Sequence, residues 1–396
     1  MLYIEIIQMT YSVHQHWDPL KVCAVGQSYP PEFYSYITNS KVRSVMERIA
    51  IETEEDYQKL ISLLKSFNVE IVRSKINEDL SIHNGRDNNY PPPPMTPRDY
   101  TAMIGEKFYM PSKMIPPETS YDAIKGNDWP EACPKNQKEF DALSNFVKQE
   151  LKEKFKVVSI DQLTYSINDH NASLHSVENL IKTQNNEILY DLDINTAMTT
   201  RVGKDLYFGT ESYNQDKRLL KQKVEKLFPD YRCHVVNTGG HGDGTFCPVI
   251  PGLIVSLYDV PSYAETFPGW EVVYLPGQSW SAVQPFLDLK TKNYGKWWVP
   301  GEELNDDFTD FVESWLGHWV GYVEETVFDV NMLVIDEKNV VCNNYNEQVF
   351  KAFDRFGITP HVINFRHRYF WDGGLHCITS DLHREGVQKD YFSERG

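Results

Sequence analysis

The feature that most constrains the fold of this chain is a block of predicted strands and helices that repeats along its 396 residues. Each block begins with an apolar strand, a short polar or glycine turn and a second strand. An amphipathic helix usually follows, and a final apolar strand ends the block. Five such blocks can be distinguished, at residues 20–74, 99–160, 198–237, 244–275 and 331–365.

A block of this size cannot bury its apolar faces alone, so successive blocks must stack against one another. Closing five of them in a ring predicts an α/β fold, a five-bladed α/β propeller of ββαβ modules whose inner strand ends converge on a central cavity. An open α/β sheet with insertions is the alternative. Two irregular, proline-containing segments, 90–97 and 114–137, are predicted to be wall or rim loops. Residues 1–396 are therefore expected to form a single domain.

The formal net charge of −17 argues against a nucleic-acid partner, because such binding relies on clustered Lys and Arg side chains that neutralise phosphates. A cationic or zwitterionic small molecule suits this charge better. No window approaches the ~20 consecutive apolar residues that a membrane helix requires. Residues 1–17 contain no Lys or Arg, unlike a secretory signal or a mitochondrial presequence. The six cysteines form no C-x-x-C pair, which favours reduced thiols in the cytoplasm.

The segment WDGGLHCITSD, residues 371–381, places a cysteine shortly after a glycine turn. Gly373 and Gly374 permit positive φ angles and a close approach of the backbone to a ligand, so the turn can hold the sulfur of Cys377 at the rim of a cavity. A cysteine is a nucleophile when a positioned base or a depressed pKa yields its thiolate. A buried structural cysteine is the alternative. His376 would point to the opposite face of an extended chain and is not expected to be the base.

A better candidate for the base lies in GGHGDGTF, residues 239–246. In a strand or an extended loop, His241 and Asp243 lie on the same face, which aims an acid/base group and a carboxylate at one spot. Half of a metal site, a dinucleotide-binding glycine loop and a solvated turn are the alternatives. The strand-like TFCPVI that follows argues against the dinucleotide loop. Asp99, in MTPRDY, is expected to begin a strand, and its pair with Arg98 would ordinarily be a surface salt bridge.

These motifs resemble those of the glycine amidinotransferases and their relatives in the guanidine-modifying superfamily, which also contains arginine deiminases and dimethylarginine hydrolases. The similarity spans nearly the whole chain. It is most specific in the C-terminal segments NMLVIDEKNVV, FDRFGITPHVINFR and GGLHCITSDLHREG, and HGDGTF, TPRDY and WDPLKVCAVG resemble further family motifs. The family fold is a five-bladed α/β propeller of ββαβ modules, in agreement with the repeated blocks.

The resemblance implies a role for each of four matched residues. Cys377 corresponds to the family nucleophile and His241 to its general acid/base. Asp99 and Asp243 correspond to the two carboxylates that bind the guanidinium group. Such an enzyme transfers an amidino group through a covalent amidino-cysteine: the histidine protonates the departing amine and later deprotonates the incoming one. Neither a metal nor an organic cofactor is implied.

The chain departs from the family pattern at several positions near the substrate. The family aspartate that orients the histidine is replaced by Asn195, or by Asp193 if the register is shifted by two residues. Val260 stands where the family arginine anchors the α-carboxylate of the donor. Glu324 and Glu325 replace two serines and would bind an ammonium group, unless they form a solvated face. These departures leave the identity of both substrates open.

The expected function is amidino transfer from L-arginine or a related alkylguanidine to a small primary amine, with glycine as the family default. Two alternatives stay open. One is a deiminase-type guanidine hydrolase, in which water resolves the amidino-cysteine, and the other is a catalytically silent protein that binds a guanidino compound. The implied partners are these small-molecule substrates, with neither nucleic acid nor a membrane, and a homodimer is compatible with the resemblance.

Overall fold

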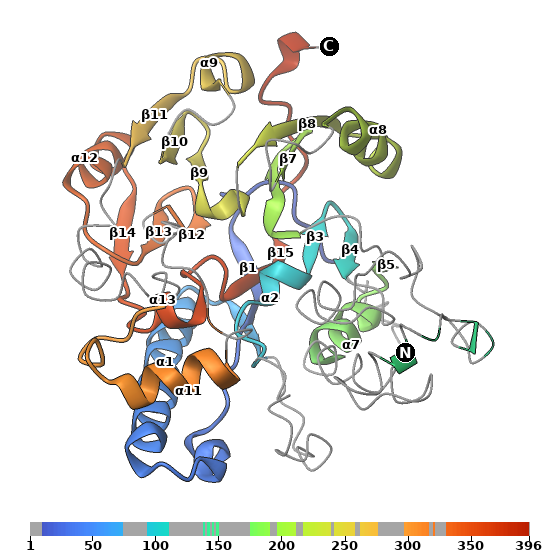
Figure 1. Ribbon diagram of the computed structural model, residues 1–396. Helices are drawn as coiled ribbons and strands as arrows, with labels where there is room; N and C mark the ends of the chain where they lie inside the picture. The colour runs from blue at the N-terminus through green and yellow to red at the C-terminus, as the bar shows by residue number, and fades with distance from the viewer. Residues whose placement is uncertain are drawn as a thin grey trace, which may run out of the picture.

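In the residues that it describes, the computed structural model contains five three-stranded sheets, arranged around a common centre (Figure 1). The predicted five-bladed α/β propeller is thereby confirmed. The structure describes residues 10–73, 93–110, 138, 141, 142, 145, 148, 149, 175–190, 196–210, 217–238, 241–257, 262–275, 297–316, 320 and 330–395.

Each sheet has the same internal order: an inner strand, a middle strand antiparallel to it, and an outer strand parallel to the middle one. From inner to outer strand, the sheets are β3 (Ala102–Ile104), β4 (Lys107–Met110) and β5 (Glu187–Tyr190); β6 (Thr199–Val202), β7 (Asp205–Thr210) and β8 (Arg232–Asn237); β9 (Phe246–Ile250), β10 (Leu253–Ser256) and β11 (Glu271–Tyr274); β12 (Leu333–Asp336), β13 (Asn339–Cys342) and β14 (Thr359–Val362); and β15 (Thr379–Arg384), β1 (Leu20–Val25) and β2 (Glu70–Arg73).

A helix lies between the middle and the outer strand of each sheet in the chain, because two parallel strands need a crossover connection. Figure 1 shows these helices at the periphery of the ring. They are α1 (Ser40–Ser66), α7 (His175–Thr183), α8 (Lys217–Leu227), α9 (Tyr263–Thr266) and α12 (Glu347–Phe356).

Helix α12 shows how the sequence sets the bounds of these helices. The side chain of Asn346 accepts a hydrogen bond from the backbone amide of Val349 and so caps the N-terminus. Gly357, at a φ of 70°, ends the helix in the left-handed conformation that glycine adopts without a steric penalty. Val349, Ala352 and Phe353 form the buried face, at the three- and four-residue spacing of an amphipathic helix.

Strands from both ends of the chain close the ring. β15, near the C-terminus, is the inner strand of the sheet that also contains β1 and β2. In this sheet Cys23 of β1 is opposite Asp381 of β15. The first predicted block had only one strand, β1, before its helix. The missing inner strand of this blade is β15, which follows Cys377 in the chain. The candidate nucleophile therefore lies at the start of an inner strand.

The second blade differs from the prediction. Its outer strand is β5, preceded by α7, whereas the predicted outer strand KVVSI (156–160) lies outside the described residues. The predicted helix at 138–155 also lies mostly outside them, as does the predicted loop at 114–137. An amphipathic helix followed by a short apolar strand occurs more than once in this part of the chain, so the pattern alone could not identify the pair that completes the sheet.

The apolar cores lie between neighbouring blades. Leu206 and Phe208 of β7 pack toward β3 and β4, whereas Tyr207 faces the opposite neighbour and packs toward β9 and α9. Such middle strands are buried on both faces, which explains why they are continuous apolar runs in the sequence. No helix within the described residues is long and apolar enough to span a membrane.

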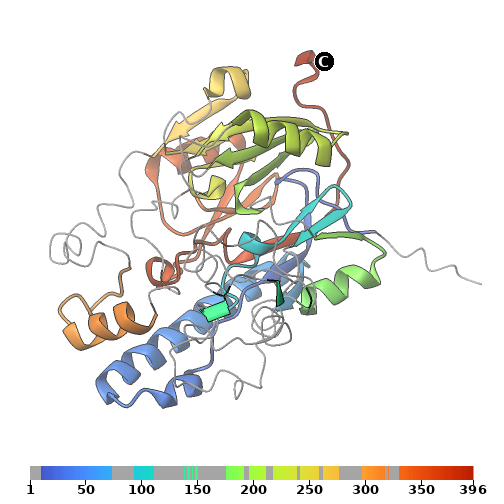
Figure 2. The ribbon, with the colours of Figure 1, turned by 45° about the vertical axis from the view of Figure 1, so that its right-hand side comes forward.

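Within the described residues, three further α-helices lie outside the ββαβ pattern. Helix α11 (Asp306–Trp315) packs beside α1 (Figure 2). The single-turn helices α2 (Pro97–Tyr100) and α13 (Arg368–Trp371) precede β3 and β15. The loop predicted at 90–97 is described from residue 93 onward, and Met95 within it is buried and accepts a hydrogen bond from Tyr57 of α1.

Candidate active site

The candidate site residues share one position in the fold. Asp99 precedes β3 by three residues and Asp243 precedes β9 by three, whereas Cys377 precedes β15 by two. Because all five sheets have the same internal order, residues that precede the inner strands come to the same end of the ring around its central axis, a region here called the pore. In Figure 1, α2 and β15 lie near the centre of the ring.

The turn that carries Cys377 needs its glycines for close packing rather than for positive φ angles. Neither Gly373 nor Gly374 has a positive φ, and the left-handed residue is Asp372, with a φ of 51°. A Cβ atom at Gly374 would lie 2.5 Å from Oδ1 of Asn331. The second glycine therefore lets the turn approach Asn331.

Asn331 holds this turn in place. Its Oδ1 accepts hydrogen bonds from the backbone amides of His376 at 2.8 Å and Cys377 at 3.1 Å. Its Nδ2 donates to Sγ of Cys377 at 2.9 Å and to the backbone carbonyl of Asp243 at 3.2 Å. The side chain of Asn331 is fully buried. Its amide therefore fixes the sulfur, and its N–H group favours the thiolate over the thiol.

Asp243 and His376 form a buried pair beside the sulfur. Asp243 lies in the 3₁₀ turn η4 (Gly242–Gly244), not in the predicted strand or extended loop. Its Oδ2 accepts a hydrogen bond from Nδ1 of His376 at 2.8 Å, and the thiol of Cys377 lies 3.5 Å from the same oxygen. The prediction that His376 and Cys377 point in opposite directions is therefore wrong, because residues 375–378 form a turn and not an extended chain.

The second carboxylate oxygen of Asp243, Oδ1, is buried and has no hydrogen-bond partner within the described part of the chain. Burial alone would raise the pKa of this carboxyl. The hydrogen bond from His376 and the positive charges of nearby groups outweigh burial and leave the pKa below its ordinary value. Asp243 is therefore ionised. Its buried Oδ1 costs folding free energy unless a donor forms a hydrogen bond with it.

Burial raises the pKa of the Cys377 thiol well above its ordinary value, and the negative charges of Asp243 and Asp99 raise it further. The hydrogen bond from Asn331 lowers the pKa of this thiol, but by less than burial and the two carboxylates raise it. The thiol is therefore protonated at neutral pH. A cation held between the two carboxylates would cancel their contribution and lower the pKa toward its ordinary value.

Asp99 and His241 form the more exposed part of the site. Nδ1 of His241 lies 3.9 Å from Oδ1 of Asp99, and the two side chains are 30% and 18% exposed. The sequence predicted that Asp99 begins a strand, but Asp99 lies in helix α2. The physical reason is Pro97, which occupies the first position of α2, where its fixed φ suits a helix and its missing N–H costs nothing.

Arg98 does not form the predicted surface salt bridge with Asp99. It is buried, and its Nη2 lies 2.9 Å from Oδ1 of Asp381. Its Nε donates to the backbone carbonyls of His376 and Thr379, each at 2.9 Å. Adjacent residues of a helix point in different directions, so Arg98 can support the cysteine turn while Asp99 extends toward His241.

Asp381 is the point at which three arginines meet. Nη2 of Arg201 lies 2.8 and 3.0 Å from its two oxygens, and Nε of Arg384 lies 2.7 Å from Oδ2. Burial alone would raise the pKa of Asp381, but Arg201, Arg98 and Arg384 hold it well below its ordinary value. Because these arginines belong to β6, α2 and β15, the cluster joins three blades next to the cysteine turn.

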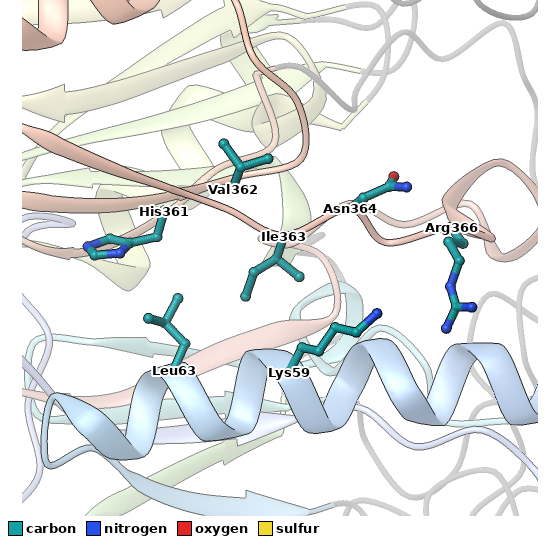
Figure 3. Close-up of a pocket in the computed structure, with 7 residues that line it drawn as sticks. All are labelled: Lys59, Leu63, His361, Val362, Ile363, Asn364 and Arg366. Carbon is teal, nitrogen blue, oxygen red and sulfur yellow. The ribbon is translucent and has the colours of Figure 1, made fainter.

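A groove of about 470 Å³ lies away from this site, between α1 and the segment that begins with β14 (Figure 3). Its two most basic side chains, Lys59 and Arg366, are both paired with Asp56. The groove contains no nucleophile, so it does not compete with the pore as a catalytic site. No cluster of His, Cys, Asp or Glu suited to a metal ion occurs within the described ranges.

Five residues that the resemblance singles out near the substrate or the histidine lie outside the described residues, and what was expected of them stays a prediction. They are Asp193, Asn195, Val260, Glu324 and Glu325.

Sequence reasoning missed Asn331, Asp381 and the buried position of Arg98. A positional signal could have identified Asn331, because it precedes β12 by two residues, as Cys377 precedes β15. No comparable signal identifies Asp381, which lies within a strand like many structural residues. Its role depends on side chains from three blades, which only the folded chain brings together.

The fold and the site define a class of protein: a five-bladed α/β propeller with a buried cysteine, two carboxylates and an imidazole near one end of its pore. No protein-family model matches the chain. Two solved structures share the fold over 97% of this chain at 14% identity: a saxitoxin-pathway amidinotransferase from Microseira wollei, with a TM-score of 0.56 and full coverage of that chain, and the inosamine-phosphate amidinotransferase of Streptomyces griseus, with a TM-score of 0.54 and 99% coverage.

Two curated relatives are similar in sequence. The mitochondrial glycine amidinotransferase of Xenopus tropicalis is 26% identical over 197 residues, which cover 49% of this chain and 39% of the relative. The L-arginine:L-lysine amidinotransferase of Pseudomonas savastanoi pv. phaseolicola is 24% identical over 223 residues, or 54% and 52% of the two chains. The chain therefore spans about half or less of these relatives. The predicted resemblance to the glycine amidinotransferases is confirmed.

Proposed function

We propose that this protein is an amidinotransferase that moves the amidino group of L-arginine, or of a related alkylguanidine, to a small primary amine through Cys377. The observation that carries the proposal is the environment of Asp243. One of its oxygens is a buried acceptor without a partner in the described part of the chain, and the other lies 3.5 Å from the sulfur of Cys377. A cation that donates hydrogen bonds to Asp243 would therefore be placed beside a nucleophile.

A guanidinium group fits this environment better than an ammonium group. It is planar, carries its charge on several N–H groups and can donate to two carboxylates at once. Oδ2 of Asp243 lies 3.5 Å from the sulfur of Cys377, and the charges of both Asp243 and Asp99 raise the pKa of the thiol, so both carboxylates contribute negative charge where the cation would bind. The formal net charge of −17 also favours the approach of a cationic donor.

In the proposed mechanism, donor binding activates the nucleophile. The guanidinium charge offsets Asp243 and Asp99, which lowers the thiol pKa, and His241 accepts the proton. Nδ2 of Asn331, 2.9 Å from Sγ, stabilises the resulting thiolate. Activation therefore coincides with the arrival of the donor, and the protonated thiol of the free protein is protected from other electrophiles.

The covalent steps balance in atoms and charge. The sulfur of Cys377 forms a bond to the central carbon of the donor, and the bond from this carbon to the alkylated nitrogen then breaks. His241 returns its proton to the departing amine, which leaves an amidino-cysteine. An incoming amine attacks the same carbon and gives a proton to His241, the carbon–sulfur bond breaks, and His241 reprotonates the thiolate. These steps form a ping-pong reaction.

The sequence similarity to two amidinotransferases supports an amine over water as the second nucleophile. Glycine is the acceptor that the family resemblance implies. The acceptor and the exact donor depend on Val260, Glu324 and Glu325, which replace family residues near the substrate. If the two glutamates face the pore, they favour a substrate that carries an additional ammonium group.

The test is to incubate the protein with labelled arginine, with and without a panel of primary amines, and to identify the products by mass. Without an amine, the expected result is at most one equivalent of ornithine per protein molecule, released as Cys377 takes up the amidino group, and ornithine and a new guanidino compound should continue to form only when an amine is present. Continued formation of citrulline and ammonia, or of ornithine and urea, in water alone would replace the proposal with the hydrolase alternative, and arginine binding without turnover would replace it with the binding-protein alternative. Cys377→Ala should abolish turnover, and Cys233→Ala, in the core of another blade, is the matched control.

A further inference from the structure

His376 is a buried titratable group that the proposed reaction does not use. Its ring is on the turn that carries the nucleophile, yet its Nδ1 lies 2.8 Å from Oδ2 of Asp243. The residue is only 9% exposed. The imidazole is therefore directed at the carboxylate that the proposed mechanism uses for donor binding.

We propose that His376 is a positioning residue, whose Nδ1–H group holds one oxygen of Asp243 so that the other faces the guanidinium group of the donor. The proposal rests on the proposed function, because it assigns the guanidinium group to Oδ1 of Asp243. It explains why one oxygen of this buried carboxylate has a partner while the other has none within the described residues. It also gives His376 a role distinct from that of His241, which is more exposed and lies beside Asp99.

The backbone around His376 fixes the direction of the ring. Its amide donates to Oδ1 of Asn331 at 2.8 Å, and its carbonyl accepts a hydrogen bond from Nε of Arg98 at 2.9 Å. On another side, the ring packs against His16, with ring centroids 5.7 Å apart. His16 is itself fixed, because its Nε2 accepts a hydrogen bond from the backbone amide of Arg201. Few side-chain rotations of His376 are compatible with these contacts.

The charge state of His376 matters for cation binding. Burial and the neighbouring charge of Arg98 together lower the pKa of this imidazole to about 4, although the hydrogen bond to Asp243 and the charges of Asp243 and Asp381 oppose them. At neutral pH the ring is therefore neutral and donates its Nδ1–H. A neutral donor orients the carboxylate without cancelling its charge, whereas an arginine or lysine in this place would compete with the bound guanidinium. A low pKa also makes His376 unsuitable as the general acid, so that role stays with His241.

The test compares two substitutions that differ in their ability to donate. His376→Phe keeps a ring of similar size and lacks the donor, whereas Asn in His376→Asn can place an N–H group where Nδ1 was. Arginine binding is measured by calorimetry in a Cys377→Ala background, so that turnover does not interfere. The dissociation constant should rise roughly ten- to hundredfold for His376→Phe, and His376→Asn should recover most of the affinity. The matched control is His361→Asn, on β14.

A pH series adds a measurement that a purely structural role would not affect. The groups that face Asp243 are His376 and Cys377 from the turn, His241 from its own loop, and Arg98 from α2. The hydrogen bond from His376 lowers the pKa of Asp243, so its loss should raise this pKa. Donor binding should then begin to fail at a higher pH in His376→Phe than in the parent as the solution is made more acidic.

Equal affinity in the parent and His376→Phe, or an equal loss in both substitutions with the same melting temperature, would overturn the positioning role. If the Cys377→Ala parent binds arginine while the unsubstituted protein transfers no amidino group, the proposed function fails, and the binding comparison still decides the role of His376. If the parent does not bind arginine, both proposals fail. Should His376→Phe not fold, a His376→Asn variant with tenfold weaker binding would be sufficient to reject the role.

Discussion

Two buried aspartates near the pore, Asp381 and Asp243, have nearly the same exposure and very different surroundings. Asp381 is fully buried and accepts four hydrogen bonds from Arg98, Arg201 and Arg384. Asp243 is 7% exposed, and its Oδ1 has no partner within the described residues. Both carboxyl groups have a lowered pKa, so both are ionised. The protein supplies hydrogen-bond donors to both oxygens of Asp381, whereas one oxygen of Asp243 has no donor within the described residues.

This difference separates structural from functional charge. A buried carboxylate whose acceptors are all used can only hold the fold together, since any ligand would have to displace an existing partner. A buried carboxylate with an unused oxygen carries a desolvation cost that a ligand can recover. Neither burial nor a lowered pKa distinguishes Asp381 from Asp243; their hydrogen-bond partners do.

The largest expected effect comes from Asp381→Asn. The substitution leaves three buried arginines without their shared anion, and breaking a buried pair in this way costs roughly 3–5 kcal/mol of folding free energy. The measurement is the free energy of unfolding in urea at pH 7. The stabilisation should be complete above about pH 4, the ordinary pKa of an aspartate, and should be lost as the pH falls toward the depressed pKa of Asp381. An unchanged unfolding curve would contradict the structural role.

A smaller effect is expected from Asp243→Asn, and in a different quantity. Asparagine can still accept the hydrogen bond from His376, so the free energy of unfolding should change little or rise. Arginine affinity should fall, because a charge-assisted hydrogen bond is worth about 1.5–3 kcal/mol. Calorimetric titration and urea unfolding of the same sample check both statements. A variant that loses stability but keeps donor affinity would reverse the assignments of the two aspartates.

The third prediction concerns the pKa of the Cys377 thiol. Because the charges of Asp243 and Asp99 contribute to its elevation, Asp243→Asn should lower it, and alkylation by iodoacetamide at pH 8 should become severalfold faster. Burial is the larger cause, so the reaction should stay slower than that of a free cysteine. Guanidinium chloride at subdenaturing concentration should accelerate alkylation in the unsubstituted protein, because a guanidinium cation beside the carboxylates lowers the thiol pKa. Alkylation that is independent of Asp243 would show that the carboxylate does not act on the sulfur.

The smallest effect is expected from a surface pair. Lys21 and Glu385 form an ion pair at 2.8 Å with side chains 42% and 69% exposed. Such pairs contribute little, because water and salt screen them. Glu385→Gln should leave both arginine affinity and the unfolding curve unchanged within error. A clear loss of either would mean that charge changes around β15 act nonspecifically, and it would weaken the comparison of Asp381 with Asp243.

The sequence predicted the fold well because the blades repeat. In the blades built from β6 to β14, apolar periodicity and local signals, such as Asn346 and Gly357 at the ends of α12, identify each strand and helix. The prediction was incomplete where the ring closes and where β5 pairs with β4, because these pairings join segments that are distant in the sequence. Local patterns contain no information about which distant strand completes a sheet.

The site could be predicted only in part. The motifs indicated Cys377, His241, Asp243 and Asp99, and the structure places these four side chains in one region. The direction of His376 and the partner of Arg98 were predicted wrongly, because the two predictions assumed extended chain and exposed surface where the protein forms buried turns.

The most direct test of the account is whether Cys377 carries an amidino group. The protein is mixed with arginine in the absence of an amine acceptor, quenched with acid, digested, and analysed by peptide mass spectrometry. The account predicts an amidino group on the peptide that contains Cys377, and its disappearance when a suitable amine is added before the quench. An unmodified Cys377, or an amidino group on a different cysteine, would contradict the account.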